Sequence, residues 1–312
     1  MTEETHRTED TPTYTAEQVT SLIHSQFPDV TIDTLRFCGE GSSFCSYAVN
    51  ETYLYRLGRE DESAERLNRE RCLLPQLQRQ LNVAIPQFQF IGTMENGCVF
   101  VVYRMIRGEP FTEEVYEHLP AAAKERVVKQ LADFLTVLHT FPVDKAAACL
   151  VRERPMLQWC TEFREQAQQK IYPKLSSTER TACEWWFDQY FREATYHAYT
   201  PALIHGDLQS RHVFFNPVDE CIAGVIDFED IWMSDPDHEL AYLRTEFGEE
   251  FGEQLLHRYG HAHPERLRWK SRLFELCHCI DEIVWGMEDN HSRHVKEGWR
   301  GLKAFLKHPF EP

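Results

Sequence analysis

The segment "ALIHGDLQSRHVFFN", residues 202–216, decides the fold together with "AGVIDF", residues 223–228. Apolar runs of strand length flank Asp207 and precede Asp227, and "NPVDE" between them is typical of a turn. Two short strands paired through that turn would hold the loop that carries Asp207 beside the end of the strand that carries Asp227. This geometry suits phosphoryl transfer, in which one carboxylate orients or deprotonates the attacking hydroxyl and another holds the Mg²⁺ that neutralises the nucleotide phosphates.

Upstream of this segment, the pattern predicts a small unit rich in β-structure. Residues 32–57 are predicted as strands joined by turns, with a hairpin turn at Asn50 and Glu51, and "IPQFQFIG" and "GCVFVVYRMI" add two more strands. Residues 15–27 and 62–81 have the apolar spacing of helices. Pro75 is expected to bend or break the second of them.

Beyond "RGEPF" the spacing becomes almost wholly helical, as in residues 121–139 and 268–305, and residues 203–230 are an irregular insert among these helices. The sequence therefore predicts an α+β protein with two lobes. The predicted parts are a flexible tail (1–13), a β-rich N-terminal lobe (14–106) and a larger helical C-terminal lobe (107–312).

Composition limits the partners of the chain. With 33 basic and 50 acidic residues the net charge is −17, and no clustered basic stripe suits nucleic acid, so a cationic small molecule is the expected partner. No apolar run reaches the roughly 18 residues of a membrane span, and the N-terminus lacks the order of a secretory signal. We expect a cytoplasmic protein whose ten cysteines are reduced thiols, with disulfides as the alternative.

The motifs "HGDL", "IDFED" and "DPDHELAYL" resemble those of the aminoglycoside phosphotransferase family, antibiotic kinases with a bilobal protein-kinase-like fold. The resemblance spans residues 32–305. It is greatest to the aminoglycoside 2″-phosphotransferases, and next to the macrolide phosphotransferases.

The resemblance implies roles for three side chains of the central segment. Asp207 would be the catalytic base at the sugar hydroxyl, and Asp227 a ligand of Mg²⁺. His212 stands where protein kinases have a metal-binding asparagine, and those antibiotic kinases also carry histidine there, so it would be the second metal ligand. The alternative for His212 is a buried histidine that ties the loop together.

The resemblance also implies a nucleotide site in the small lobe. Arg56 of "YLYRLG" stands where these kinases commonly have a lysine for the nucleotide phosphates, and Glu70 would pair with it, although an exposed surface pair is the alternative. Backbone groups of "YRMIRGEP" would meet the purine, which leaves ATP and GTP both open. The predicted nucleotide-binding residues are Gly39, Gly41, Ser42 and Ser43 of "GEGSSF", with Arg56, Glu70, Arg104 and Ile106.

For the acceptor, a floor of carboxylates would attract a polycation, and a tryptophan could pack against sugar rings. Solvated helix faces are the alternative for each of these residues, while Asp235 and Asp237 are predicted to be structural or helix-capping. The predicted acceptor-binding residues are Glu246, Glu249, Asp281, Glu282, Trp285 and Glu288.

Three functions fit these predictions. The first is an O-kinase that uses ATP or GTP with Mg²⁺ and phosphorylates an aminoglycoside, at the 2″ hydroxyl. The second is a kinase of a macrolide or a hydroxyl-bearing metabolite, and the third is a silent nucleotide-binding relative, suggested by Arg56 and His212. A protein kinase is disfavoured because "SDPDHELAYL" follows Asp227 directly, with no long peptide-docking segment, and "CHC" at 277–279 lacks the spacing of a zinc site.

Overall fold

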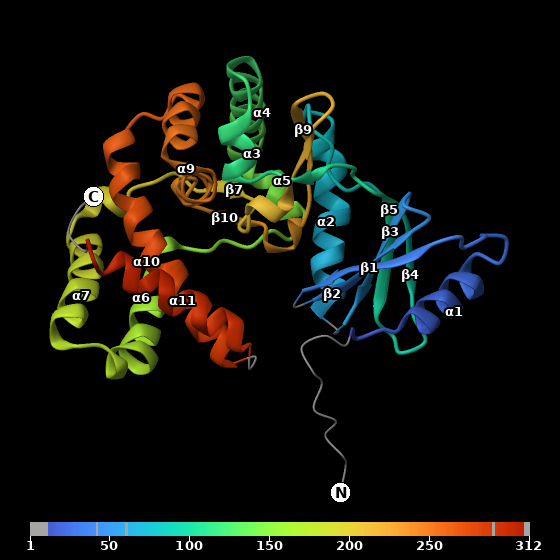
Figure 1. Cartoon of the computed structure of the whole chain (residues 1–312), viewed down its shortest axis with the longest axis horizontal. Helices are drawn as coiled ribbons and strands as arrows, with labels where there is room; N and C mark the ends of the chain where they lie inside the picture. Colours follow the sequence, from blue (N-terminus) through green and yellow to red (C-terminus); the bar gives the residue numbers. More distant parts are fainter. Residues whose placement is uncertain (1–11, 42, 60–61, 289–290, 309–312) are drawn as a thin grey trace, which may run out of the picture.

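The computed structural model describes residues 12–41, 43–59, 62–288 and 291–308, and shows two lobes side by side (Figure 1). A five-stranded antiparallel sheet forms the smaller lobe, and helices dominate the larger one, which confirms the predicted kinase-like α+β fold. Residues 1–11 of the predicted tail lie outside the described residues, whereas Thr13 donates to Glu40. No helix among the described residues is long and apolar enough to cross a bilayer.

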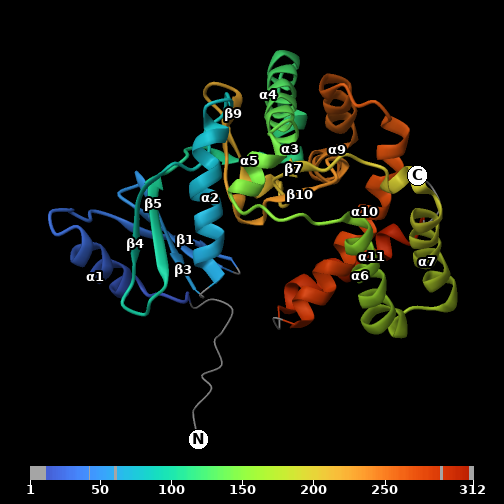
Figure 2. The same ribbon diagram turned by 180° about the vertical axis from the view of Figure 1, so that it is seen from behind.

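The sheet of the small lobe has the order β1-β2-β3-β5-β4. Helix α2 lies between this sheet and the helical lobe, and α1 covers the opposite side, as both views show (Figures 1 and 2). Asn50 and Glu51 have positive φ angles and join β2 to β3, which confirms the predicted hairpin turn. The elements are α1 (Ala16–Gln26), β1 (Leu35–Glu40), β2 (Phe44–Val49), β3 (Tyr53–Gly58), α2 (Glu62–Gln78), β4 (Phe88–Thr93) and β5 (Val99–Arg104).

Helix α2 continues through Pro75, so the predicted break does not occur. Pro75 lies in the last turn of the helix, where the loss of one N–H donor removes a single hydrogen bond, and Leu74 and Leu77 on either side of it are fully buried. Burial of these leucines outweighs the local cost of the proline.

The helical lobe contains two hydrophobic cores. One joins α4 and α9 to the irregular insert, and the other joins α6, α7, α10 and α11. Its helices are α3 (Glu113–His118), α4 (Ala121–His139), α5 (Val143–Ala148), α6 (Met156–Gln166), α7 (Ser177–Arg192), α8 (Ala194–His197), α9 (Asp237–Tyr259), α10 (Pro264–Glu288) and α11 (Ser292–Phe305).

Two small sheets form the irregular insert. Strands β8 (Val213–Asn216) and β9 (Cys221–Val225) pair antiparallel, with Val213 opposite Val225, which confirms the pairing predicted from the turn between them; β6 (Glu109–Pro110) extends this sheet. Strand β7 (Ala202–Ile204) pairs with β10 (Trp232–Ser234). The segment of β10 was not predicted as a strand, because it has only three residues and no alternating pattern.

A disulfide joins Cys72 of α2 to Cys149 at the end of α5. The prediction that all ten cysteines are thiols is therefore wrong. The two cysteines are 77 residues apart, with Cα atoms 5.4 Å apart, and only the packing of α2 against the helical lobe brings them together. The other eight cysteines are free.

We expect Cys72→Ser to lower the free energy of unfolding by about 4 kcal/mol under oxidising conditions, because the cross-link closes a long loop in the unfolded chain. Denaturant unfolding with and without a thiol reductant measures this difference. The exposed thiol Cys38 gives the matched control, Cys38→Ser, which should unfold like the wild type. An equal midpoint for the wild type with and without reductant would contradict the prediction.

Candidate active site

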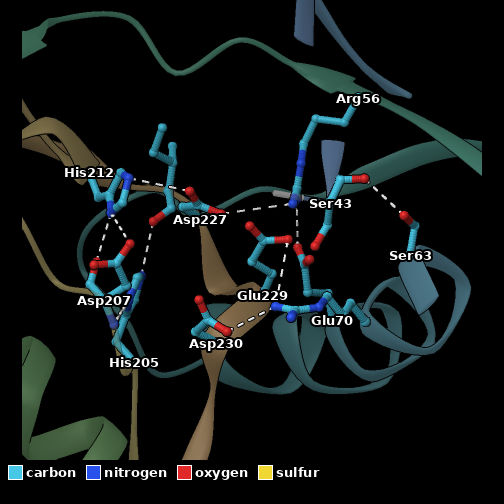
Figure 3. A network of polar contacts seen from close by, with 12 residues as sticks. Ser43, Arg56, Ser63, Glu70, His205, Asp207, His212, Asp227, Glu229 and Asp230 are labelled. Carbon is cyan, nitrogen blue, oxygen red and sulfur yellow. Dashed lines mark hydrogen bonds and ion pairs between the residues drawn. The ribbon is translucent and has the colours of Figure 1, made fainter. Parts of the chain in front are cut away.

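The loop after β7 carries Asp207 at the junction of the two lobes (Figure 3). Gly206 before it has φ +86°, and a Cβ at this position would collide with the carbonyl oxygen of Asp230. Glycine is therefore the residue that lets the chain turn here. The loop then continues as a single 3₁₀ turn, Ser210–His212, into β8.

The carboxylate of Glu239, on α9, binds the backbone of this loop. Its Oε1 accepts hydrogen bonds from the backbone N–H groups of His205 and Gly206, the latter at 3.2 Å, and its Oε2 lies 2.9 Å from Nε2 of His139 on α4. The side chain is 1% exposed. Sequence reasoning assigned Glu239 no role, because it follows the polar residues Asp237 and His238 and its burial depends on how α9 packs.

His212 and the two aspartates lie together. One ligand atom of each of Asp207, His212 and Asp227 lies within 4.8 Å of the others, and His212 is 5% exposed. Nε2 of His212 is 3.3 Å from Oδ2 of Asp227. Two carboxylates and one imidazole are ligands that fit a divalent cation, although Mg²⁺ prefers oxygen ligands.

The hydrogen bonds of His212 fix which of its nitrogens could face a cation. Nδ1 is 2.7 Å from the carbonyl oxygen of Asp207 and must donate to it, while Nε2 accepts from Nε of Arg211 at 3.1 Å. Nε2 has a single lone pair, which accepts from Arg211 here, so a cation bound between Nε2 and Asp227 would displace the hydrogen bond from Arg211. The hydrogen bonds to Asp207 and Arg211 tie the loop together, as the alternative expectation for His212 required.

Arg56 and Glu70 form a buried ion pair on the small-lobe side of the site (Figure 3). Nη1 of Arg56 is 2.8 Å from Glu70, Nη2 is 3.9 Å from Asp227, and the ring of Phe44 lies 4.4 Å below the guanidinium. Burial lowers the pKa of Arg56, but the charges of Glu70 and Asp227 outweigh burial and leave its pKa raised. The predicted contact is thus present and buried rather than exposed, while its role toward phosphates stays a prediction.

Glu229 lies two residues after Asp227, in the short 3₁₀ turn Phe228–Asp230. Its carboxylate is 11% exposed, and Oε2 has no hydrogen-bond partner among the described residues. Burial and the charge of Asp227 raise the pKa of Glu229 to about 8. A Cβ on Gly41 would lie 4.0 Å from Oε1 of Glu229, so the glycine-containing turn lies directly above this carboxyl group.

The other predicted nucleotide-binding residues lie around this point. Gly39 has φ +147°, and the carbonyl oxygen of Ser43 accepts from Ser63 of α2, whereas Ser42 lies outside the described residues. Arg104 ends β5, and Ile106 packs against Gly224 of β9 in the connection between the lobes. Whether these residues bind a nucleotide stays a prediction.

Of the predicted acceptor-binding residues, Glu246 and Asp281 lie near Asp207. Glu246 accepts from the backbone N–H of Ser210 at 2.8 Å. Burial raises the pKa of Asp281, His278 and Arg154 oppose that rise, and the charge of Asp207 adds to it. Burial raises the pKa of Tyr242, and the charges of Asp207, Asp281 and Glu246 add to that rise. We call Asp207, Tyr242, Glu246 and Asp281 the acceptor cluster.

The remaining four predicted acceptor-binding residues make contacts of their own at the surface. Glu249 pairs with Arg244, Glu282 with His294 at 3.4 Å, and Glu288 with Lys170, while Trp285 stacks on His291. They stay predictions, and the structure does not bring them into the acceptor cluster.

Asp235 and Asp237 are structural, as predicted. Asp235 accepts from the N–H of Asp237 at the start of α9, and both carboxylates bind the fully buried Lys270.

A sheet with a buried arginine–glutamate pair, above a helical lobe that brings Asp207, His212 and Asp227 together, defines a kinase-like phosphotransferase. The model of the phosphotransferase enzyme family (APH) matches residues 34–270. The chain belongs to this family.

Solved structures and curated proteins agree with this assignment. The GDP and kanamycin complex of APH(2″)-IIIa is 31% identical, with a TM-score of 0.87 over 94% of this chain and 99% of that chain. Viomycin phosphotransferase of Streptomyces vinaceus is 27% identical over 65% of this chain and 69% of its own length. The macrolide 2'-phosphotransferase MphH of Brachybacterium faecium shares the fold at 19% identity, with a TM-score of 0.68 over 94% of this chain and 99% of that one. The predicted resemblance is confirmed.

We expect Glu239→Ala to lower the free energy of unfolding by about 3 kcal/mol, because it leaves the buried N–H groups of His205 and Gly206 without an acceptor. Urea unfolding measures the loss. Glu250→Ala removes an exposed glutamate of the same helix, which pairs with Lys124, and should cost much less. Equal losses in the two variants would refute this account of Glu239.

His238 predicts a pH dependence of stability. It is 6% exposed beneath the acceptor cluster, and burial, with the charges of Arg154, His278 and Lys270, lowers its pKa to about 3. In the unfolded chain a histidine binds a proton below about pH 6.5, which the buried ring does not, so this contribution to stability is lost as pH falls from about 6.5 to 3.

The expected slope from His238 is about 1.4 kcal/mol per pH unit below the unfolded pKa. His238→Phe keeps a ring in place and should flatten the pH dependence of the unfolding free energy by that amount. His257→Phe, on the exposed face of α9, is the control. An unchanged slope in His238→Phe would show that another group takes up the proton.

Proposed function

We propose that the protein transfers the γ-phosphoryl group of ATP or GTP to a hydroxyl of an aminoglycoside, the 2″ hydroxyl. The observation that carries this proposal is the cluster of Asp207, His212 and Asp227 beneath the Arg56–Glu70 pair. The 31% identity to a 2″-phosphotransferase solved with GDP and kanamycin, and the 25% identity to one solved with gentamicin, support the choice of acceptor.

Each side chain of the cluster has a task in this reaction. Asp207, held by the backbone of its loop, accepts the proton of the acceptor hydroxyl as the oxygen attacks phosphorus. Asp227 and Nε2 of His212 would hold Mg²⁺, which when bound neutralises charge on the phosphate oxygens. Arg56, fixed by Glu70, donates hydrogen bonds to phosphate oxygens on the other side, where its planar fork suits them.

The acceptor cluster supports a cationic substrate. Glu246 binds the backbone of the catalytic loop at Ser210, and the charges of Glu246 and Asp281 act with that of Asp207 to raise the pKa of Tyr242, which burial raises most. An ammonium group of the acceptor would bind there and bring a neighbouring hydroxyl toward Asp207. A macrolide or a hydroxyl-bearing metabolite is the alternative acceptor, and viomycin phosphotransferase among the relatives is the reason to test a further antibiotic.

Arg56 and His212, which suggested a silent relative, both have buried contacts in the site. An active enzyme can use these contacts, so we favour catalysis over silent binding. Transfer to any acceptor would exclude the silent alternative.

We expect Asp207→Ala to lower phosphate transfer to kanamycin by at least about 100-fold, because the general base is lost. Transfer from labelled ATP and GTP to kanamycin and gentamicin measures this effect. The nucleotide should still raise the melting temperature of the variant, since the side chains that would bind phosphates remain. Asp219→Ala changes an exposed aspartate in the β8–β9 turn and is the matched control. Full activity of Asp207→Ala would defeat the mechanism, and wild-type protein that modifies no aminoglycoside would defeat the proposed acceptor.

A further inference from the structure

Arg154 lies on the segment between α5 and α6, which runs beside β10. Its backbone N–H donates to the carbonyl oxygen of Met233 at 2.9 Å, and its carbonyl oxygen accepts from Oγ of Ser234 at 2.6 Å. The N–H of Met233 donates to the carbonyl oxygen of Arg152. The backbone on both sides of Arg154 is therefore fixed to a strand of the insert, and its side chain starts from a rigid position.

The guanidinium of Arg154 lies against two tryptophan rings. Its Cζ atom is 5.3 Å from the ring centroid of Trp159 and 5.6 Å from that of Trp232. Both contacts place the guanidinium over a ring face, which leaves the N–H groups of Arg154 for other partners. Over the described ranges of the chain, these N–H groups make no hydrogen bond and no ion pair within 4.0 Å.

Such a guanidinium is unusual, because burial without hydrogen bonds is costly for a charged group. Burial lowers the pKa of Arg154, and the charges of Asp281, Asp230 and Glu162 counteract that effect without direct contact. The side chain is half-buried, so part of it can be reached from solvent. The N–H groups of Arg154 can therefore donate hydrogen bonds to an oxygen atom of a bound molecule.

Arg154 lies beside the acceptor cluster. The ring of Trp159, which contacts Arg154, lies 5.1 Å from the ring of His238, and the ring of His238 lies 4.9 Å from that of Tyr242. In keeping with this placement, the charge of Arg154 opposes the rise in the pKa of Asp281 that burial causes. Trp232 also approaches the catalytic loop, since its Cδ1 atom is 3.2 Å from the position that a Cβ on Gly206 would take. The guanidinium therefore lies on the acceptor-cluster side of the catalytic loop, whereas Arg56 lies on the small-lobe side of the site.

We propose that Arg154 is an acceptor-binding, specificity-determining residue whose N–H groups donate to an oxygen of the acceptor, while Asp281 binds a neighbouring ammonium group. This inference rests on the proposed function and refines it. The site then selects acceptors that carry an oxygen acceptor close to a cationic amine, as amino sugars do, over acceptors with ammonium groups alone. The carboxylates by themselves could not make this distinction, because they bind any cation.

Arg154→Met tests the proposal, since methionine keeps an unbranched stem against the tryptophans but has no donor. We expect the KM for kanamycin to rise about 10- to 100-fold, the range for a lost hydrogen bond to a charged group, and the KM for the nucleotide to change less than about two-fold. Arg154→Lys keeps the charge without the planar fork and should lie between the two. Arg152→Met, the same change at an exposed arginine two residues earlier, should alter neither KM.

A double-mutant cycle with Asp281→Asn separates binding from mere charge neutralisation. If Arg154 and Asp281 bind different groups of the acceptor, the fold-changes in KM for kanamycin multiply in Arg154→Met/Asp281→Asn. If Arg154 only neutralises Asp281, the second substitution cancels the effect of the first, and the proposal is overturned. An unchanged acceptor KM in both Arg154→Met and Arg154→Lys, with melting temperatures near that of the wild type, overturns it as well.

A set of different acceptors distinguishes failure of the proposed function from failure of the proposed role of Arg154. The same variants are assayed with kanamycin, gentamicin, viomycin and a macrolide. Transfer by the wild type only to viomycin or the macrolide contradicts the proposed aminoglycoside acceptor, and the KM of Arg154→Met for that other acceptor then decides the role of Arg154. Transfer to none of the four contradicts both proposals.

Discussion

The carboxylate of Glu239 is the constraint on which the site depends. It lies in the core of the helical lobe and accepts from two consecutive backbone N–H groups of the loop before Asp207, while His139 holds its second oxygen. A buried carboxylate with these partners fixes the loop more firmly than apolar packing alone, because any shift of the loop would leave a charge without donors. Helices α4 and α9 thereby set the position of Asp207 before any substrate arrives.

From this fixed loop the rest of the site follows through backbone pairing. The loop leads into β8, β8 pairs with β9, and β9 ends just before Asp227, so the two aspartates are placed by one short hairpin. His212 then joins them, since it bonds the backbone of Asp207 through one nitrogen and faces Asp227 with the other. The small lobe adds a buried cation, Arg56, which Glu70 holds at the edge of the same cluster.

Much of this could be predicted from the sequence, and what could not has a physical reason. Apolar runs and turn residues around Asp207 and Asp227 were enough for the β8–β9 hairpin, because its contacts are local in sequence. The Cys72–Cys149 bond and the position of Arg154 over Trp159 and Trp232 depend on how separate elements pack, which periodicity does not encode. For the acidic residues of α9 and α10, too, the sequence pattern does not show which side chains face the site. All of them fit a cation-binding floor by composition, but the rotation of each helix turns Glu246 and Asp281 toward Asp207 and leaves Glu249 and Glu288 in surface ion pairs.

The disulfide has a mechanical consequence for the two lobes. The bond between Cys72 and Cys149 is one of several links between the small lobe and the helical lobe. Ala84 pairs with β9 through two backbone hydrogen bonds, and leucines of α2 lie in a core of the helical lobe. Helix α2 is therefore fixed to the helical lobe along its length. Glu70 lies two residues before Cys72 on this helix, so the side chain that binds Arg56 is held in place against the helical lobe even before a ligand enters the site.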